Sequence, residues 1–332
     1  MTFAETAIAE RVDAAVLAGD TWHTRAPSPG AILQVIRPVR AMAEAGIPVV
    51  IDLGNHEMAS VAGGEGTTLA WLGELDLPNV YVATEGRCIH LDCGTFAVLP
   101  YVHKRSVEGG TLPERMAAAS AELAFHIAAM ADFRRPGLPL VFVGHLTVTG
   151  AMLGSEAAMQ LGWDATVAPE AFAPYDLACL GHIHAKQVVS ERAFYAGSPD
   201  VHGFDDDDAS RKGFWLHDTD ANTHRFIPSH PRAFVTVPEA DLVSMAESMP
   251  QGAVVRLVLA DERTPAGIRD AVRLLKDAGA FYVRITTPEK HTVRRTQQAV
   301  DVTPRAQMEA WLAANKYPIE PALAIAEEVM AS

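Results

Sequence analysis

The sequence predicts an α/β protein built from mixed β-sheets flanked by helices, and two observations carry this prediction. Short apolar runs at residues 14–18 and 47–53 enclose a segment with helical periodicity at residues 29–45. Strand, helix and strand in this order form a parallel βαβ unit. Two further apolar strands are expected at residues 139–143 and 176–180, and polar residues directly follow each of these strands.

Length and composition indicate a folded protein with more than one structural unit. The 332 residues suffice for one large core and a smaller appendage, and 49% of them are hydrophobic. A second strand, helix and strand begin beyond residue 232, and two short amphipathic helices are expected at the C-terminal end. We therefore divide the chain into a core at 1–232, a small α/β domain at 233–300 and a helical segment at 301–332.

Charge and hydropathy restrict the possible partners. No apolar run approaches the roughly 20 residues needed to cross a bilayer, and the acidic N-terminus does not resemble a signal peptide. We expect a cytoplasmic protein without a membrane partner. A net charge of −14 is unfavourable for binding nucleic acid unaided, because Lys and Arg normally make the phosphate contacts. A DNA substrate would therefore require metal ions or a partner to supply positive charge.

Four predicted strands end in a glycine that is followed by a candidate metal ligand. The four blocks are Gly19-Asp20, Gly54-Asn55-His56-Glu57, Gly144-His145 and Gly181-His182-Ile183-His184. The carboxyl ends of strands in α/β sheets form a common crevice, so these blocks are expected to converge. Their mixed oxygen and nitrogen donors suit Mn²⁺, Fe²⁺ or Zn²⁺ better than Mg²⁺ or Ca²⁺. Two such ions about 4 Å apart can clamp a phosphoryl group.

The blocks resemble those of the calcineurin-like metallophosphoesterases, which read D-x-H, G-D, G-N-H-[DE], G-H and G-H-x-H. The last four of these five blocks occur here in order. Further segments resemble the SbcD-like double-strand-break repair nucleases within that superfamily: GDTWH at 19–23, PSP at 27–29, YAGSP at 195–199, Phe204-Asp205 and Lys212-Gly213. The resemblance covers about residues 10–235. It implies a metallophosphoesterase sandwich with a small capping domain and C-terminal helices.

The same resemblance assigns a set of metal ligands. It implies that Asp20 bridges two divalent ions, with Mn²⁺ preferred. Asn55, His145 and His182 would complete one metal site, and His184 would bind the other ion.

The resemblance also assigns the residues that act on the phosphate. His56 would be the acid that protonates the leaving oxygen, and Glu57 would orient it. His23 would contact the scissile phosphate or a nearby nucleotide.

The family's first block, D-x-H, does not occur at the matching place, so the second metal site is expected to be incomplete. We expect either a mis-set start or a truncated chain, or else a natural variant that binds without cutting. The implied activity is DNA phosphodiester hydrolysis, with an SbcC-like coiled-coil ATPase as partner and a possible homodimer. The alternatives are a non-catalytic scaffold for DNA ends and the ATPase, and a phosphodiesterase of small molecules.

Overall fold

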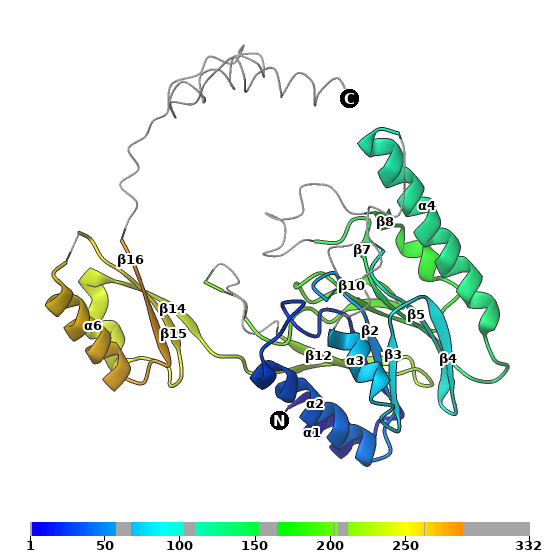
Figure 1. Ribbon diagram of the computed structural model, residues 1–332, viewed down its shortest axis with the longest axis horizontal. Helices are drawn as coiled ribbons and strands as arrows, with labels where there is room; N and C mark the ends of the chain where they lie inside the picture. The colour runs from blue at the N-terminus through cyan, green and yellow to red at the C-terminus, as the bar shows by residue number, and fades with distance from the viewer. Residues whose placement is uncertain are drawn as a thin grey trace, which may run out of the picture.

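The computed structural model has the predicted α/β architecture, with several sheets flanked by helices (Figure 1). It describes residues 2–57, 68–102, 110–152, 165–201, 203–204, 212–261 and 263–287. The C-terminal helices expected beyond residue 301 lie outside the described residues. No helix in the described ranges is long and apolar enough to cross a membrane.

The first sheet is parallel and contains the predicted βαβ unit. Its strand order is β1-β2-β3, with β1 at an edge. The elements are α1 (Phe3–Glu10), β1 (Ala15–Ala18), α2 (Pro29–Glu44), β2 (Val49–Asp52), α3 (Thr68–Glu74) and β3 (Val80–Ala83). Helix α2 begins where the Ser28 hydroxyl accepts the backbone N–H of Ala31 and where proline occupies the first turn. The sequence predicted this helix and both neighbouring strands, but neither α3 nor β3.

The second sheet is mixed, with the strand order β10-β11-β9-β6-β5-β4. Its outer pairs β10–β11 and β4–β5 are antiparallel, whereas the inner pairs are parallel. The strands are β4 (Arg87–Leu91), β5 (Gly94–Leu99), β6 (Leu140–His145), β9 (Leu177–Gly181), β10 (Gln187–Ser190) and β11 (Ala193–Tyr195). Helix α4 (Leu112–Met130) packs on this sheet, and the short strands β7 (Thr147–Val148) and β8 (Thr166–Val167) lie near the helix.

Three hydrophobic clusters show how these elements form layers. One cluster joins α1 and α2 to the first sheet through Val39, Met42 and Ile51. A second joins the two sheets, since Val50 of β2 packs with residues of β5 and β6. The third joins α4 to the second sheet, for example through Ile127. The layers are therefore helix, sheet, sheet and helix, which is consistent with a metallophosphoesterase-like fold.

A separate cluster forms the small α/β unit at the left of Figure 1. Its three strands are parallel, in the order β14-β15-β16. The unit contains β14 (Phe234–Pro238), α5 (Leu242–Glu247), β15 (Val254–Val258), α6 (Pro265–Asp277) and β16 (Tyr282–Thr286). The predicted strand, helix and strand correspond to β15, α6 and β16, whereas β14 and α5 were not anticipated.

A cavity of about 540 Å³ lies beside the edge strand β1. Val16 of β1 and Ala7 of α1 line it on one side, and Phe194 of the second sheet lines it on another. Phe214 lines it from β12 (Gly213–Asp218), which forms a two-stranded hairpin with β13 (Thr223–Pro228). The cavity therefore lies in the middle layers of the core.

Two histidines face each other across the β12–β13 hairpin. His217 pairs with His224 in the strand register, and their Nδ1 atoms are 2.9 Å apart. Both rings pack against Phe194, with ring centroids 4.8 and 4.3 Å away. Burial, and then the charge of His224, lower the pKa of His217 from 6.5 to about 4. Folding therefore favours the neutral form of His217.

We predict that the free energy of unfolding falls as the pH drops from 6.5 to about 4. In this window the unfolded state binds more protons than the folded state, because folding lowers the His217 pKa. The loss should be on the order of 1–3 kcal/mol. Urea unfolding at several pH values measures it. A His217→Gln variant should lose this part of the slope, and an unchanged slope would contradict the assignment to His217.

Candidate metal centre

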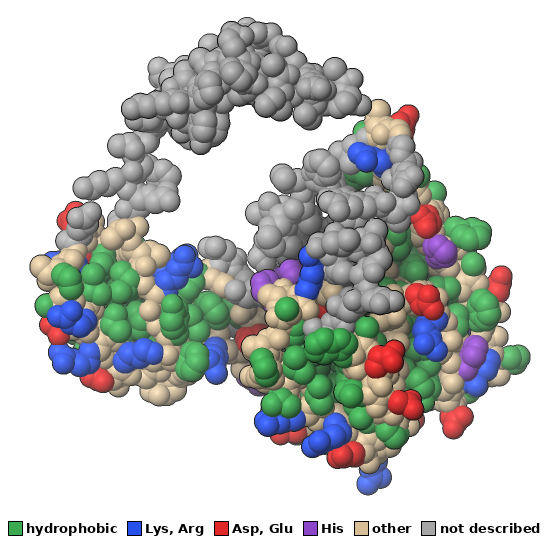
Figure 2. Space-filling model, viewed as in Figure 1, with side chains coloured by type: hydrophobic (Ala, Val, Ile, Leu, Met, Phe, Trp, Pro, Cys, Tyr) green, Lys and Arg blue, Asp and Glu red, His purple; other side chains and the backbone are tan. Residues whose placement is uncertain are grey.

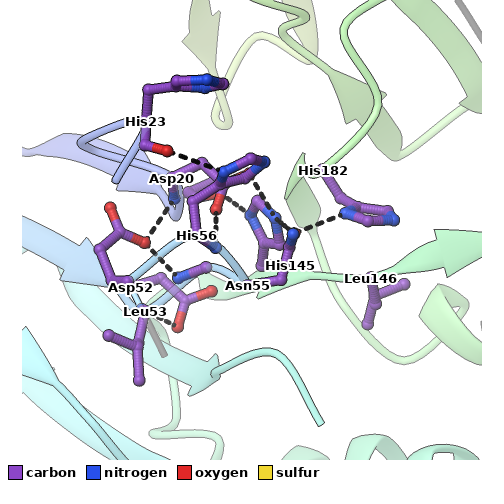
Figure 3. Close-up of polar contacts among 12 residues, drawn as sticks. Asp20, His23, Asp52, Leu53, Asn55, His56, His145, Leu146 and His182 are labelled. Atoms are coloured by element: carbon purple, nitrogen blue, oxygen red, sulfur yellow. Dashed lines mark hydrogen bonds and ion pairs between the residues drawn. The ribbon is translucent and has the colours of Figure 1, made fainter. Parts of the chain in front are cut away.

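Four predicted ligands meet where strands of both sheets end. Asp20 follows β1 and Asn55 follows β2, whereas His145 is the last residue of β6 and His182 follows β9. Figure 3 shows these side chains pointing toward one another. The expected convergence of the strand ends therefore occurs, but it joins two sheets rather than one open sheet.

Short distances connect the donor atoms of this cluster. His145 Nε2 lies 3.1 Å from Asp20 Oδ2 and 3.0 Å from Asn55 Oδ1. His182 Nδ1 also lies 3.0 Å from Asn55 Oδ1. The Asn55 amide oxygen is thus the atom that links the two histidines.

The hydrogen bonding of His145 explains why a cation fits here. Its Nδ1 lies 2.9 Å from the carbonyl oxygen of Ala18, which can only accept, so Nδ1 carries a proton. In the neutral ring, Nε2 then presents a lone pair toward Asp20 Oδ2 and Asn55 Oδ1, which are acceptors as well. Several lone pairs facing one another are unfavourable unless a proton or a metal ion lies between them.

The pKa shifts of His145 and Asp20 are consistent with a positive charge lying between these facing lone pairs. Burial would lower the pKa of His145, but the hydrogen bond and charge of Asp20 outweigh it, and the net shift is upward. Burial would raise the pKa of Asp20, yet its contacts with His145 and His56 lower it to about 2. Both shifts favour a protonated imidazole beside an ionised carboxylate.

The spacing of the donor atoms fits a divalent ion. Adjacent ligands at right angles around an ion with bonds of about 2.1 Å lie roughly 3.0 Å apart. The contacts of 3.0, 3.0 and 3.1 Å within the cluster match that spacing. Within the described ranges, no three His, Cys, Asp or Glu side chains are grouped closely enough to hold an ion. An ion at this place would be held by the amide oxygen of Asn55 together with the other donors.

The backbone around the ligands is strained and tightly packed. Asp20 and His182 have backbone φ values of 49° and 90°, in a region that residues other than glycine rarely adopt. A Cβ on Gly54 would overlap the backbone of Asp20, and a Cβ on Gly181 would overlap the carbonyl of Ala18. Such strain persists only where the surroundings enforce it, and it is concentrated at functional sites.

Glu57 has partners different from those expected. Its side chain is buried with 1% exposure, and its oxygens accept the backbone N–H groups of Asp20, Trp22 and Gly54 at 3.1, 2.9 and 3.0 Å. The expectation that Glu57 orients His56 is therefore wrong in this structure, because both carboxylate oxygens point at backbone donors. Glu57 instead ties the loop after β1 to the loop after β2.

His56 and His23 lie together beside the cluster. His56 Nδ1 is 3.0 Å from the carbonyl oxygen of His23, and the two rings stack at 5.0 Å. The backbone N–H of His56 donates to Asp20 Oδ1 at 2.9 Å, while its Nε2 is 3.9 Å from Asp20 Oδ2. The structure therefore brings both predicted histidines to Asp20. His184 lies two residues beyond His182 in the loop after β9.

Sequence reasoning missed two residues next to this cluster. Asp52 is fully buried at the end of β2, and burial raises its pKa well above the usual value. The Tyr101 ring lies 5.7 Å from that of His182 and 6.1 Å from that of His145. The acidic residue within an apolar strand was a visible signal for Asp52, whereas Tyr101 follows β5 without any local motif.

Comparison with known proteins gives a distant relationship. No protein-family model matches the chain. The SbcD subunit of the nuclease SbcCD from Escherichia coli strain K12 is 27% identical over 225 residues, which is 61% of this chain and 54% of that protein. The chain is distantly similar to this nuclease component. The corresponding protein of Rhodobacter capsulatus is 27% identical over 223 residues, or 59% of this chain and 54% of that protein. The chain thus spans about half the length of the curated relatives it matches.

We predict that Glu57→Gln destabilises the protein by about 1–3 kcal/mol. The amide would place its own N–H₂ group against backbone donors that the carboxylate now accepts. Urea unfolding compared with Glu44→Gln, a change at an exposed residue of α2, isolates this effect. Equal stability of the two variants would contradict the bracing role of Glu57.

Proposed function

We propose that this protein is a metal-dependent DNA phosphodiesterase, an exonuclease or endonuclease component in double-strand-break processing. The observation that carries the proposal is the set of facing lone pairs on Asp20, Asn55 and His145, extended by His182. The similarity to the SbcD component of the nuclease SbcCD supports a nuclease over other phosphoesterases. The spacing of the donors supports a divalent ion at this place.

Asp20, Asn55, His145 and His182 would hold one ion, and Asp20 and His184 would contribute to a second. The donors are carboxylate, amide and imidazole, a set suited to Mn²⁺. Bound divalent ions would supply positive charge to the phosphate oxygens and lower the pKa of water. The strained loops at Asp20 and His182 pre-orient these donors, which lowers the cost of assembling the site.

His56 is placed to move a proton at the edge of the site. With Nδ1 donating to the His23 carbonyl, the protonated ring has one N–H left, on Nε2, on the side of Asp20. We propose that Nε2 gives this proton to the leaving oxygen of the DNA strand. The stacked His23 ring would lie against the phosphate or a neighbouring nucleotide.

Figure 2 shows acidic and basic side chains interspersed on the visible face, in a protein of net charge −14. Phosphate binding normally depends on clustered Lys and Arg. We therefore propose that metal ions and an SbcC-like ATPase partner supply much of the positive charge that DNA binding needs. Charge from the partner would add to the salt dependence of DNA binding by the complex.

We predict that the Mn²⁺-dependent cutting of linear DNA falls about 100-fold or more in His56→Ala, since general acids contribute factors of that size. His126→Ala, a change on the exposed surface of α4, serves as the matched control. Hydrolysis of a small chromogenic diester without DNA cutting would indicate a small-molecule phosphodiesterase instead. Binding of DNA ends without cutting would indicate a scaffold.

The cavity of about 540 Å³ lies along the outer edge of β1. The outer edge of β1 has no strand partner among the described residues, and residues of β12 also line the cavity. Residues of helix α1 and apolar residues such as Phe96 and Phe194 also line the cavity. We propose that the outer edge of β1 is a pairing site for an extended, apolar strand.

We predict that a designed apolar strand added before α1 slows amide exchange at Val16 and Leu216 at least tenfold. Both residues line the cavity, so pairing would protect their backbones. Exchange in β15, which belongs to the separate small unit, is the internal control. The same extension with two central prolines cannot pair and should give no protection. Equal protection by both extensions would contradict strand insertion.

A further inference from the structure

Two buried polar side chains lie behind the loop that carries His182 and His184. Ser198 and Lys212 belong to the YAGSP and KG segments, and their exposures are 5% and 3%. Lysine is almost never buried to this extent, because an ammonium group taken out of water must be hydrogen-bonded. This burial therefore indicates a specific task for Lys212.

The contacts of Lys212 converge on the main chain of His184. Lys212 Nζ donates to Ser198 Oγ at 2.8 Å and to the His184 carbonyl oxygen at 3.4 Å. The Ser198 backbone N–H donates to the same carbonyl at 3.2 Å. The Ser198 hydroxyl in turn donates to the Asp200 carbonyl at 2.8 Å. The His184 carbonyl is thus held by two donors from a single buried network.

The chain on either side of this network is fixed as well. Gly197 has a φ of 74°, and a Cβ there would lie 2.8 Å from the His184 carbonyl oxygen. The Ser229 backbone N–H donates to the carbonyl of Lys212 at 3.0 Å, which ties Lys212 to the end of β13. The hairpin therefore provides a fixed base from which Lys212 reaches the ligand loop.

The ligand loop needs such a restraint. His182 has a φ of 90°, a conformation that costs free energy and relaxes unless neighbouring contacts enforce it. His182 Nδ1 must stay near Asn55 Oδ1, now 3.0 Å away, for both to bind one ion. A network holding the carbonyl of His184, two residues further on, restricts the direction in which this loop can relax.

We propose that Lys212 is a positioning residue for the metal centre. Through Ser198 and the His184 carbonyl, it holds the loop of residues 182–184 in its strained form and keeps both imidazoles at the site. This inference rests on the proposed function, because it takes His182 and His184 as metal ligands.

We predict that Lys212→Met weakens Mn²⁺ binding at least tenfold, as measured by calorimetry on the full chain without DNA. Ser198→Ala, which removes only the hydroxyl, should weaken it in the same direction by a smaller factor. The control is Tyr175→Phe, which loses a buried hydrogen bond to the Ile127 carbonyl on the α4 side of the core. This control should lower the urea midpoint while leaving Mn²⁺ affinity unchanged.

A second measurement separates this proposal from the proposed function. The ¹⁵N chemical shift of His182 Nδ1 in metal-free protein reports on its contact with Asn55, and it should change in Lys212→Met but not in Tyr175→Phe. An unchanged shift overturns the positioning role, as does equal Mn²⁺ affinity in wild type and Lys212→Met. If wild type binds no Mn²⁺ while the shift still changes, the proposed function fails and the positioning of His182 by Lys212 stands.

Discussion

The imidazole of His145 is the contact on which the rest of the centre depends. Its Nδ1 donates to the carbonyl of Ala18 at the end of β1, while its Nε2 faces Asp20 and Asn55. One ring thus joins the second sheet to the loops that follow β1 and β2 of the first. The ring is buried, and the contact with the Ala18 carbonyl fixes its tautomer so that Nε2 faces the cluster.

Around this ring, buried polar groups fix loops that would otherwise be free to relax. Glu57 accepts backbone N–H groups from the loops after β1 and β2, and Lys212 donates to the loop after β9. Each side chain satisfies main-chain groups at the carboxyl end of a strand, where the sheet hydrogen bonding stops. The predicted metal centre is therefore braced by buried side chains that are not among its predicted ligands, an arrangement that is common at metal sites.

The placement of the core strands accounts for both the site and the cavity. Two sheets bring four strand ends together, while the outer edge of β1 faces a cavity lined by α1, β12 and the second sheet. The edge of β1 that is open among the described residues therefore faces this cavity rather than another strand.

The sequence by itself determined the elements whose signals are local. Apolar runs ending in glycine predicted β1, β2, β6 and β9 and the four predicted ligands that meet after them, and helical periodicity predicted α2. Only the tertiary structure decided that these strands belong to two sheets, that Glu57 braces the backbone rather than His56, and that Lys212 reaches the His184 carbonyl. The physical reason is that strand ends and helix caps depend on residues nearby in the sequence. The partner of a buried polar group depends instead on which distant main-chain groups are brought within about 3 Å of it by packing.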